Sequence, residues 1–509
     1  MVYENNSYVI VMVTSLFERM KMKCSQYWPD KASSKYGCFV VTIIEEKIFA
    51  NYVVRKLRLS VASKKLGKED KAREIQQFHF TEWPDHDVPV HPMSLLPFIR
   101  HSKLANPPDA GPLVVHCSAG VGRTGVYMVI DSMMERINDD KTVDVFNYLV
   151  HIRSQRMSLV QEERQYIFIH DCLLEYIKFG DTSIPIKEFH TRLATLRAVG
   201  PGHKKSLLRR EFEDIDHTKN LEKHKWAGRK HYNLLKNRRK DILPVERTRV
   251  KLPLLLGVDG ADYINASYID GFIKKREFIA TQAPMVETAE CFYRMVSAVK
   301  SSHIVMLLDD EQWKKDDYAD LPTEDEPVMC GRFEINLESK EIHEKFTVRK
   351  LRLFSSETSD GHIVTHYHYH DWPSGCIPKD KTALINFIEH VRESRTAENS
   401  DKPLIVICDY GVGPAGVFCL VSSLYDQIEH EQNVDVFLAA KLFRTQRPKL
   451  IETEELYSFC YDVMDQVITR KLISTTTESH STCRSENISD EKNGSQLPSL
   501  NDVAFDMNV

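Results

Sequence analysis

The sequence repeats itself once, and this duplication limits the architectures that the chain can adopt. Three pairs of segments match in the same order: 77–85 with 366–374, 114–125 with 406–416, and 153–156 with 444–447. Cys408 lies 291 positions after Cys117 (408 − 117), and a nearby offset of 289 relates the first pair of segments. We therefore expect two tandem copies of one domain.

The repeat also sets the expected domain boundaries. A chain of 509 residues has room for several domains, and we expect a first domain over 1–182 and a second over 183–470. Residues 471–509 are rich in Ser, Thr, Asn and charge and are predicted to form a disordered tail. The second copy contains residues 186–294 ahead of the segment that matches Met1 onward. The first domain is therefore predicted to lack its N-terminal portion.

Composition excludes several classes of protein. The formal net charge of −5 gives no global basic field for nucleic acid. Eleven cysteines without a C-x-x-C pair argue against a disulfide scaffold and a cysteine zinc site. No apolar run approaches the roughly 18 residues of a membrane helix. We expect a protein of a reducing compartment, with no membrane span in this chain.

The coarse pattern is that of an α/β protein. Residues 40–44 and 112–115 are rich in β-branched residues and are predicted to be strands. Residues 124–137 and 162–178 have apolar residues at helical spacing and are predicted to be helices.

The segment around Cys117 joins a strand, a small-residue loop and a helix start, an arrangement that binds anions. Gly120 and Gly122 permit successive backbone N–H groups to turn inward. The planar guanidinium of Arg123 can hold two phosphate oxygens, and the Thr124 hydroxyl can stabilise the sulfur as a leaving group. A cysteine at such a helix start is expected to have a lowered pKa, within about 3.5–7.5. The alternative is a buried cysteine in a glycine-rich turn.

Two further elements can complete a phosphoryl-transfer site. Asp85, in the proline-stiffened loop WPD at 83–85, can protonate a departing oxygen. Gln161 and Gln165 lie one helical turn apart, and Gln161 can orient a water molecule. Taken alone, the triplet is more often a surface turn and the glutamines a solvated helix face.

The first copy resembles the tyrosine-specific protein phosphatases, and the tandem is similar to the cytoplasmic part of receptor-type members. The matching strings are KCSQYWP at 23–29, QFHF at 77–80, WPDH at 83–86, HCSAGVGRTG at 116–125 and VQEERQY at 160–166. The resemblance implies two tandem phosphatase domains, each a twisted mixed β-sheet flanked by helices, the first without its N-terminal portion. It also implies localisation at the inner face of the plasma membrane, with a membrane link only through a missing N-terminal region.

The resemblance implies roles for the residues that match. Cys117 would be the nucleophile, Arg123 the phosphate clamp, Asp85 the general acid and then base, and Gln161 with Gln165 would position water. The phosphate would bind to Ser118, Ala119, Gly120, Val121, Gly122 and Arg123, beside Thr124. Glu18 would hold Arg123, Lys23 would approach the Asp85 loop, and His116 would support the site. The expected partners are phosphotyrosine proteins, with contact between the two domains, and no metal or cofactor is needed.

The second copy is predicted to be a pseudophosphatase with a structural, regulatory or docking role. It keeps Cys408 but has Pro414 in place of Arg123, Ser374 in place of Asp85 and Glu452 in place of Gln161. Proline also removes one N–H from the loop.

Two alternatives stay open. The chain is either a phosphotyrosine hydrolase or a non-catalytic phosphotyrosine-binding scaffold, whereas dual-specificity phosphatases lack these strings in this arrangement. His366, His368 and His370 alternate along a predicted strand, which is compatible with zinc binding. Because they align with Gln77, His79 and Thr81, structural histidines are the favoured interpretation.

Overall fold

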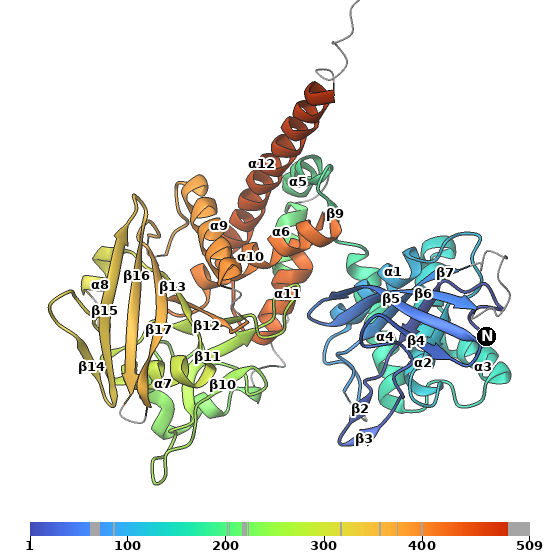
Figure 1. The fold of residues 1–509 in the computed structure, drawn as a ribbon, viewed down its shortest axis with the longest axis horizontal. Helices are drawn as coiled ribbons and strands as arrows, with labels where there is room; N and C mark the ends of the chain where they lie inside the picture. Colours follow the sequence, from blue (N-terminus) through green and yellow to red (C-terminus); the bar gives the residue numbers. More distant parts are fainter. Residues whose placement is uncertain are drawn as a thin grey trace, which may run out of the picture.

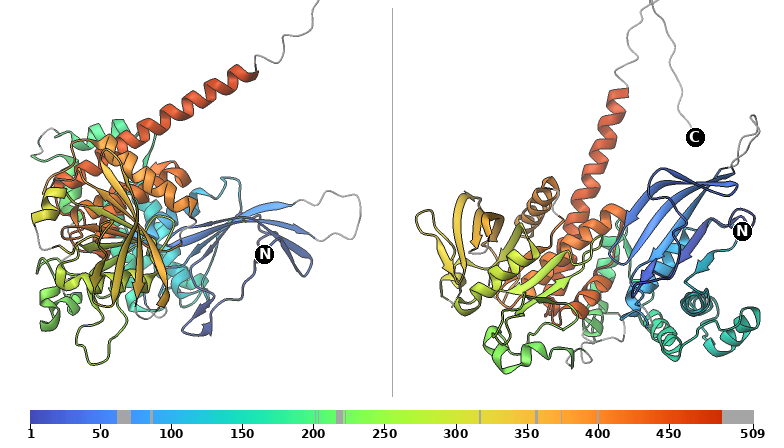
Figure 2. Two further views of the ribbon diagram at one scale, coloured as in Figure 1. Left: turned by 60° about the vertical axis from the view of Figure 1, so that its left-hand side comes forward. Right: turned by 60° about the horizontal axis from the view of Figure 1, so that its bottom comes forward.

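The chain forms two α/β bodies that follow each other along the sequence (Figure 1). A computed structural model describes residues 1–61, 72–84, 87–200, 202, 204–215, 221, 223–315, 318–355, 358–373, 375–398 and 401–486. Figure 2 shows the two bodies in contact from two further directions, with the last helix projecting away from the second body.

The first body is built on a mixed sheet. Among the described residues it has six strands in the order β4-β5-β6-β7-β1-β8. The strands are β1 (Val9–Met12), β4 (Ser33–Tyr36), β5 (Phe39–Ile48), β6 (Tyr52–Val61), β7 (Arg73–Phe80) and β8 (Val114–His116). Strand β1 runs parallel to both β7 and β8, whereas β4 to β7 pair antiparallel. A two-stranded ribbon, β2 (Phe17–Glu18) with β3 (Lys21–Met22), follows β1.

The second body has the same sheet, extended at one edge. Within the described ranges it has nine strands in the order β10-β11-β12-β18-β13-β17-β16-β15-β14. The strands are β10 (Arg249–Lys251), β11 (Tyr263–Ile269), β12 (Phe278–Gln282), β13 (His303–Leu307), β14 (Val328–Cys330), β15 (Phe333–Ile342), β16 (Phe346–Ser355), β17 (Thr358–Tyr369) and β18 (Leu404–Cys408). By the repeat offset, β18 corresponds to β8. Strand β18 lies between β12 and β13, whereas β8 ends the described part of the first sheet.

Helices cover the sheets in both bodies. Those of the first are α1 (Leu95–Leu104), α2 (Gly122–Asp140), α3 (Val145–Gln155) and α4 (Glu163–Phe179). Those of the second are α5 (Phe189–Arg197), α6 (Leu207–Ile215), α7 (Ala289–Val299), α8 (Asp310–Lys315), α9 (Lys381–Ala397), α10 (Gly413–Glu431), α11 (Val436–Gln446) and α12 (Glu454–Glu486). The duplication extends to the caps: Asp144 accepts from the backbone N–H of Asn147 before α3, and Asp435 accepts from that of Leu438 before α11. The strands predicted at 40–44 and 112–115 correspond to β5 and β8, and the helices predicted at 124–137 and 162–178 correspond to α2 and α4.

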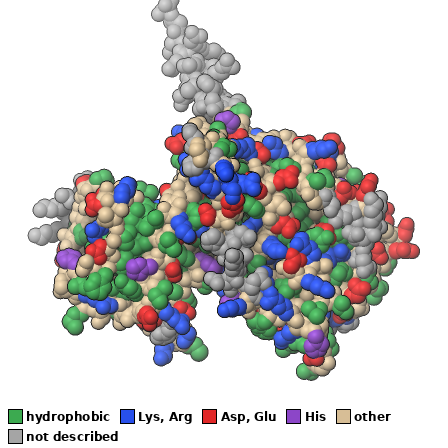
Figure 3. Space-filling model, turned by 180° about the vertical axis from the view of Figure 1, so that it is seen from behind, with side chains coloured by type: hydrophobic (Ala, Val, Ile, Leu, Met, Phe, Trp, Pro, Cys, Tyr) green, Lys and Arg blue, Asp and Glu red, His purple; other side chains and the backbone are tan. Residues whose placement is uncertain are grey.

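Each body buries its own apolar core. In the first, β1, β7 and the buried faces of α1, α2 and α4 pack around Phe80, Phe98 and Ile130. In the second, α10 is buried along nearly its whole length between β18, α11 and α12. Apolar side chains also remain at the surface of the first body, on the left in Figure 3.

The two bodies meet at the turn between β5 and β6. The ring of Phe49 packs edge-on against Phe272, with ring centroids 5.5 Å apart. The backbone N–H of Ala50 donates to the carbonyl of Phe272 at 3.0 Å. Glu82, immediately before the WPD triplet, forms an ion pair with Lys275. Strand β9 (Ile184–Pro185), which follows α4, already pairs with β19 (Asn433–Val434) of the second body.

The C-terminal segment corrects one prediction. Disorder is predicted from residue 471, but α12 continues to Glu486. The helix begins in the packed core of the second body, and extending an existing helix costs far less than starting one. The remainder of the predicted tail, 487–509, lies outside the described residues. No helix in the described ranges is long and apolar enough to span a membrane.

Candidate active site

The loop between β8 and α2 forms a cradle around the Cys117 sulfur. Gly120 has a φ of 70°, in the left-handed region that favours glycine. Gly122 is the first residue of α2, and a Cβ there would be crowded, at 3.0 Å from Oε1 of Gln161 and 3.1 Å from Nε2 of Gln165. The side chains of the two predicted glutamines, Gln161 and Gln165, therefore lie next to Gly122 in the cradle. They are also joined to each other, since the N–H of Gln161 donates to Oε1 of Gln165 at 3.0 Å.

Cys117 has two opposing influences on its pKa. Burial raises the pKa of the thiol, and hydrogen bonds from the Thr124 hydroxyl and from the backbone N–H groups of Thr124, Val121 and Gly120 lower it. The hydrogen bonds prevail, so the pKa lies below the ordinary value for cysteine. The Thr124 hydroxyl is buried and has no hydrogen-bond partner of ordinary geometry in the described part of the chain, so it is available to the sulfur. The hydrogen bonds of the cradle thus shift the thiol equilibrium toward the thiolate.

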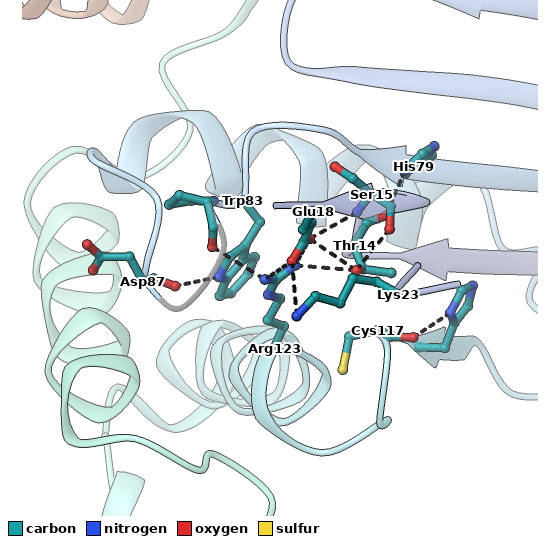
Figure 4. Close-up of polar contacts among 11 residues, drawn as sticks. Thr14, Ser15, Glu18, Lys23, His79, Trp83, Asp87, Cys117 and Arg123 are labelled. Carbon is teal, nitrogen blue, oxygen red and sulfur yellow. Dashed lines mark hydrogen bonds and ion pairs between the residues drawn. The ribbon is translucent and has the colours of Figure 1, made fainter. Parts of the chain in front are cut away.

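Arg123 is held beside the cradle by a buried carboxylate (Figure 4). Its two terminal nitrogens donate to the two oxygens of Glu18 at 2.5 and 2.8 Å. The Glu18 side chain is only 6% exposed. Such a fork is the strong, directional form of an arginine–carboxylate pair. Lys23 reaches the same carboxylate, with 3.9 Å between Nζ and Oε2.

The ion pair between Arg123 and Glu18 is held by further groups, which were not predicted from the sequence. The Thr14 hydroxyl donates to Oε1 of Glu18 at 3.2 Å, and the N–H of Ser15 donates to the same oxygen at 3.3 Å. The guanidinium of Arg123 also donates to the Pro84 carbonyl at 3.3 Å and lies 5.9 Å from the centroid of the Trp83 ring. These contacts join residues far apart in the chain, and no local pattern signals them.

Arg156 is a further residue that was missed as part of the site. Its guanidinium donates to the carbonyls of Gly120 and Ala119 at 2.8 and 3.2 Å. Those bonds leave the loop N–H groups free to point toward the sulfur. The signal was present in the sequence, since the RSQR string at 153–156 recurs as RTQR at 444–447.

The remaining predicted residues have three different positions. The ring of His116 bonds to the Tyr27 hydroxyl at 2.8 Å and to the Cys117 carbonyl at 3.1 Å, so it supports the strand end. Ser118 and Ala119 lie on the exposed part of the loop. Asp85 lies outside the described residues, although its neighbour Pro84 contacts Arg123.

A comparison with protein families matches this chain to one of them twice. The family described as protein-tyrosine phosphatase matches residues 1–175 and 233–466. The chain belongs to the protein-tyrosine phosphatase family. The two matched regions correspond to the two α/β bodies, so the fold is a tandem of phosphatase domains.

Receptor-type relatives share most of the chain. Receptor-type tyrosine-protein phosphatase S of Gallus gallus is 38% identical over 461 residues, which is 91% of this chain and 30% of the relative. Receptor-type tyrosine-protein phosphatase alpha of Mus musculus is 37% identical over 468 residues, 92% of this chain and 56% of the relative. Tyrosine-protein phosphatase Lar of Drosophila melanogaster is 37% identical over 91% of this chain and 22% of its own length. The chain thus spans between a fifth and just over half of these relatives.

The second phosphatase domain keeps the cradle, but the residues around it differ from those of the first domain. Cys408 is buried, and burial raises the pKa of its thiol to about 11. Hydrogen bonds from the backbone N–H groups of the loop lower the pKa, but by less than burial raises it. Pro414 stands at the position of Arg123, and Glu452 pairs with Arg239 at 3.4 Å. Ser374, the counterpart of Asp85, lies outside the described residues.

The degenerate cradle is nevertheless firmly held. Arg447, the counterpart of Arg156, is fully buried and donates to the carbonyls of Gly411 and Tyr410. It also donates to Ser267 and Asn265 of β11, at 3.1 and 2.9 Å. The loop of the second domain is therefore held in place by Arg447, although Pro414 and Glu452 stand where the first domain has Arg123 and Gln161.

Proposed function

We propose that the first domain hydrolyses phosphotyrosine through a covalent intermediate on Cys117. The Cys117 thiolate attacks phosphorus, an S–P bond forms and the bond from phosphorus to the tyrosine oxygen breaks. Asp85 gives its proton to the departing phenolic oxygen. A water molecule held by Gln161, with Gln165 assisting, then attacks phosphorus while Asp85 takes its proton. Phosphate leaves, and the thiolate is restored.

Positive charge and N–H dipoles take the place of a metal in this proposal. The loop N–H groups of residues 118–122 bind the equatorial phosphate oxygens, and the Arg123 fork binds the charge that is spread over them in the transition state. Glu18, Thr14 and Ser15 hold that fork in place before substrate arrives, so little reorganisation is needed. Glu18 and Lys23 are therefore positioning residues.

One observation carries the proposal: the Cys117 sulfur lies in a cradle whose hydrogen bonds outweigh burial and lower the thiol pKa. A core cysteine without this role behaves differently, as Cys172 of α4 shows, since burial raises the pKa of its thiol well above the ordinary value.

A peptide assay tests the function. The purified chain should release phosphate from a phosphotyrosine peptide and much less from the matched phosphoserine peptide. Binding of the phosphotyrosine peptide without release would instead support the non-catalytic scaffold, the second candidate. The observation that favours that candidate is the smaller sheet of the described first domain, which ends at β8, whereas in the second domain the strand β18 is followed by β12, β11 and β10.

The proposed role of Asp85 has its own test. Replacement by alanine removes the acid, and we expect kcat to fall by about 10²–10⁴-fold while a phosphotyrosine peptide still binds. Asp87→Ala is the matched control, because Asp87 belongs to the same loop but its carboxylate pairs with Arg164 at 3.4 Å. Rapid-quench kinetics and peptide pull-down measure the two effects. Equal turnover in Asp85→Ala and wild type would remove Asp85 from the mechanism.

The pH dependence of Cys117 gives a second test within the site. In Thr124→Val the thiolate loses a donor, so the pKa of Cys117 should rise and alkylation by iodoacetamide should move to higher pH. A hydrogen bond to a charged group contributes about 1.5–3 kcal/mol, so on the acid side of the profile we expect a roughly tenfold slower reaction. An unchanged alkylation profile would show that Thr124 does not donate to the sulfur.

For the second domain we propose a regulatory or docking role without catalysis. Its thiol is held protonated at neutral pH, Pro414 cannot clamp a phosphate, and its fold persists through Arg447. The partners of the whole chain would be phosphotyrosine proteins at the inner face of the plasma membrane, as part of a longer receptor.

A further inference from the structure

Three side chains of the second domain form a cluster that the phosphatase function does not use. Asp310 begins α8, His368 lies near the end of β17, and His370 follows that strand. Each offers one ligand atom, and these atoms lie within 4.8 Å of one another. The sequence singled out His366 together with these two histidines, but the structure replaces His366 by Asp310.

The separations within the cluster suit a first-row transition metal. Oδ1 of Asp310 lies 2.9 Å from Nδ1 of His370 and 3.8 Å from Nε2 of His368. Two ligands on tetrahedral zinc, at about 2.0–2.1 Å from the ion, lie roughly 3.4 Å apart. The observed separations fall on either side of this value, so small movements of exposed Asp310 and half-buried His370 would place the three atoms around one ion.

The surroundings of the cluster also suit a cation. The cavity beside the cluster has four carboxylates, on Asp310, Asp320, Glu324 and Asp325, against two cations, on Lys340 and Arg349. At present Nε2 of His368 bonds to the Leu308 carbonyl at 2.9 Å. Because that bond requires the proton on Nε2, coordination through Nε2 needs the tautomer with the proton on Nδ1, which has no hydrogen-bond partner among the described residues. The Leu308 carbonyl then loses its donor and can accept from a metal-bound water.

A comparison with the first domain separates the ligand that both domains share from the two that occur only in the second. His79, the counterpart of His368, bonds to the Thr14 carbonyl at 2.8 Å in the same way. The counterparts of Asp310 and His370 are Leu16 and Thr81, neither of which ligates a metal in this manner. The second domain has therefore added two ligands of the right chemistry around a histidine that both copies share.

We propose that Asp310, His368 and His370 bind one divalent transition-metal ion of the zinc class. Two imidazole nitrogens and a carboxylate, with water in the fourth position, form a ligand set that such ions prefer. The ion would join the start of α8 to the segment that leads into Trp372, which is the second domain's counterpart of the WPD loop. The proposal is independent of catalysis by Cys117.

Metal titration of the full chain tests the proposal. The protein is stripped with a chelator and titrated with Co²⁺, followed by visible absorption, and with Zn²⁺, followed by calorimetry. We expect His370→Ala and Asp310→Asn each to lose one equivalent of bound metal. Replacing even an outer-shell partner typically weakens metal binding 10- to 100-fold, so loss of a direct ligand should cost at least tenfold.

A matched control separates this site from adventitious binding by the other histidines. His190→Ala removes the exposed histidine that pairs with Asp465 at 3.2 Å, a histidine–carboxylate pair without a second imidazole. We expect its stoichiometry to equal that of wild type. Circular dichroism checks that each variant is folded, and neither tested ligand is fully buried. Equal metal binding by wild type and by both ligand variants, or no binding by wild type, would overturn the proposal.

Discussion

Cys117→Ser is expected to abolish phosphate release from a phosphotyrosine peptide, by about 10⁴-fold or more. The serine hydroxyl is not ionised near neutral pH, so the same cradle of N–H donors no longer holds a nucleophilic anion. Substrate binding should persist, because the loop amides and Arg123 are unchanged. Steady-state kinetics and peptide binding measure the two effects.

Cys408→Ser provides the internal control for this experiment. It makes the same change at the equivalent position of the second domain, where burial keeps the thiol protonated. Turnover should stay at the wild-type value. Activity that survives Cys117→Ser but disappears in Cys408→Ser would transfer catalysis to the second domain and contradict the proposed function.

The second large effect is expected for Arg123→Lys. Lysine keeps the positive charge but has no planar fork, so it cannot hold two phosphate oxygens in the transition state or both oxygens of Glu18. Loss of one such stabilising donor typically lowers kcat by about 10²–10³-fold, and we expect a loss in this range with a smaller change in KM.

Arg58→Lys is the matched control for that variant. Arg58 also pairs with a carboxylate, that of Glu74 at 3.2 Å, but on an exposed strand position away from the cradle. Its kcat should not change. A similar small loss in both variants would mean that Arg123 contributes charge alone and that its geometry is unimportant.

The contrast between Cys117 and Glu18 shows how far sequence reasoning reaches. The string HCSAGVGRTG is contiguous, so the strand, the glycine loop and the helix start could be predicted from local chemistry alone. The residues that hold Arg123 come from another part of the chain, and nothing local in Thr14 or Ser15 signals that role. Only the fold, in which β1 lies beside β8, brings them together.

The histidine cluster illustrates the same limit in the second domain. Alternation along a strand predicted that His366, His368 and His370 would share a face, but ligand geometry depends on the neighbouring loop. Asp310 reaches the cluster because β13 pairs in parallel with β17, which places the start of α8 beside the end of that strand. The helix over residues 471–486 was not predicted for a related reason. The composition of this segment carries no information about the packed part of α12 that precedes it and from which the helix continues.

The contact between the two domains has a consequence for experiments on fragments. The turn after Phe49 rests on Phe272, Asn51 accepts from the N–H of Thr81, and Glu82 pairs with Lys275. The base of the segment that carries the proposed acid is therefore anchored on the neighbouring domain. Rate constants measured on an isolated first domain would describe an active site in which Glu82, just before the WPD triplet, has lost its ion pair with Lys275.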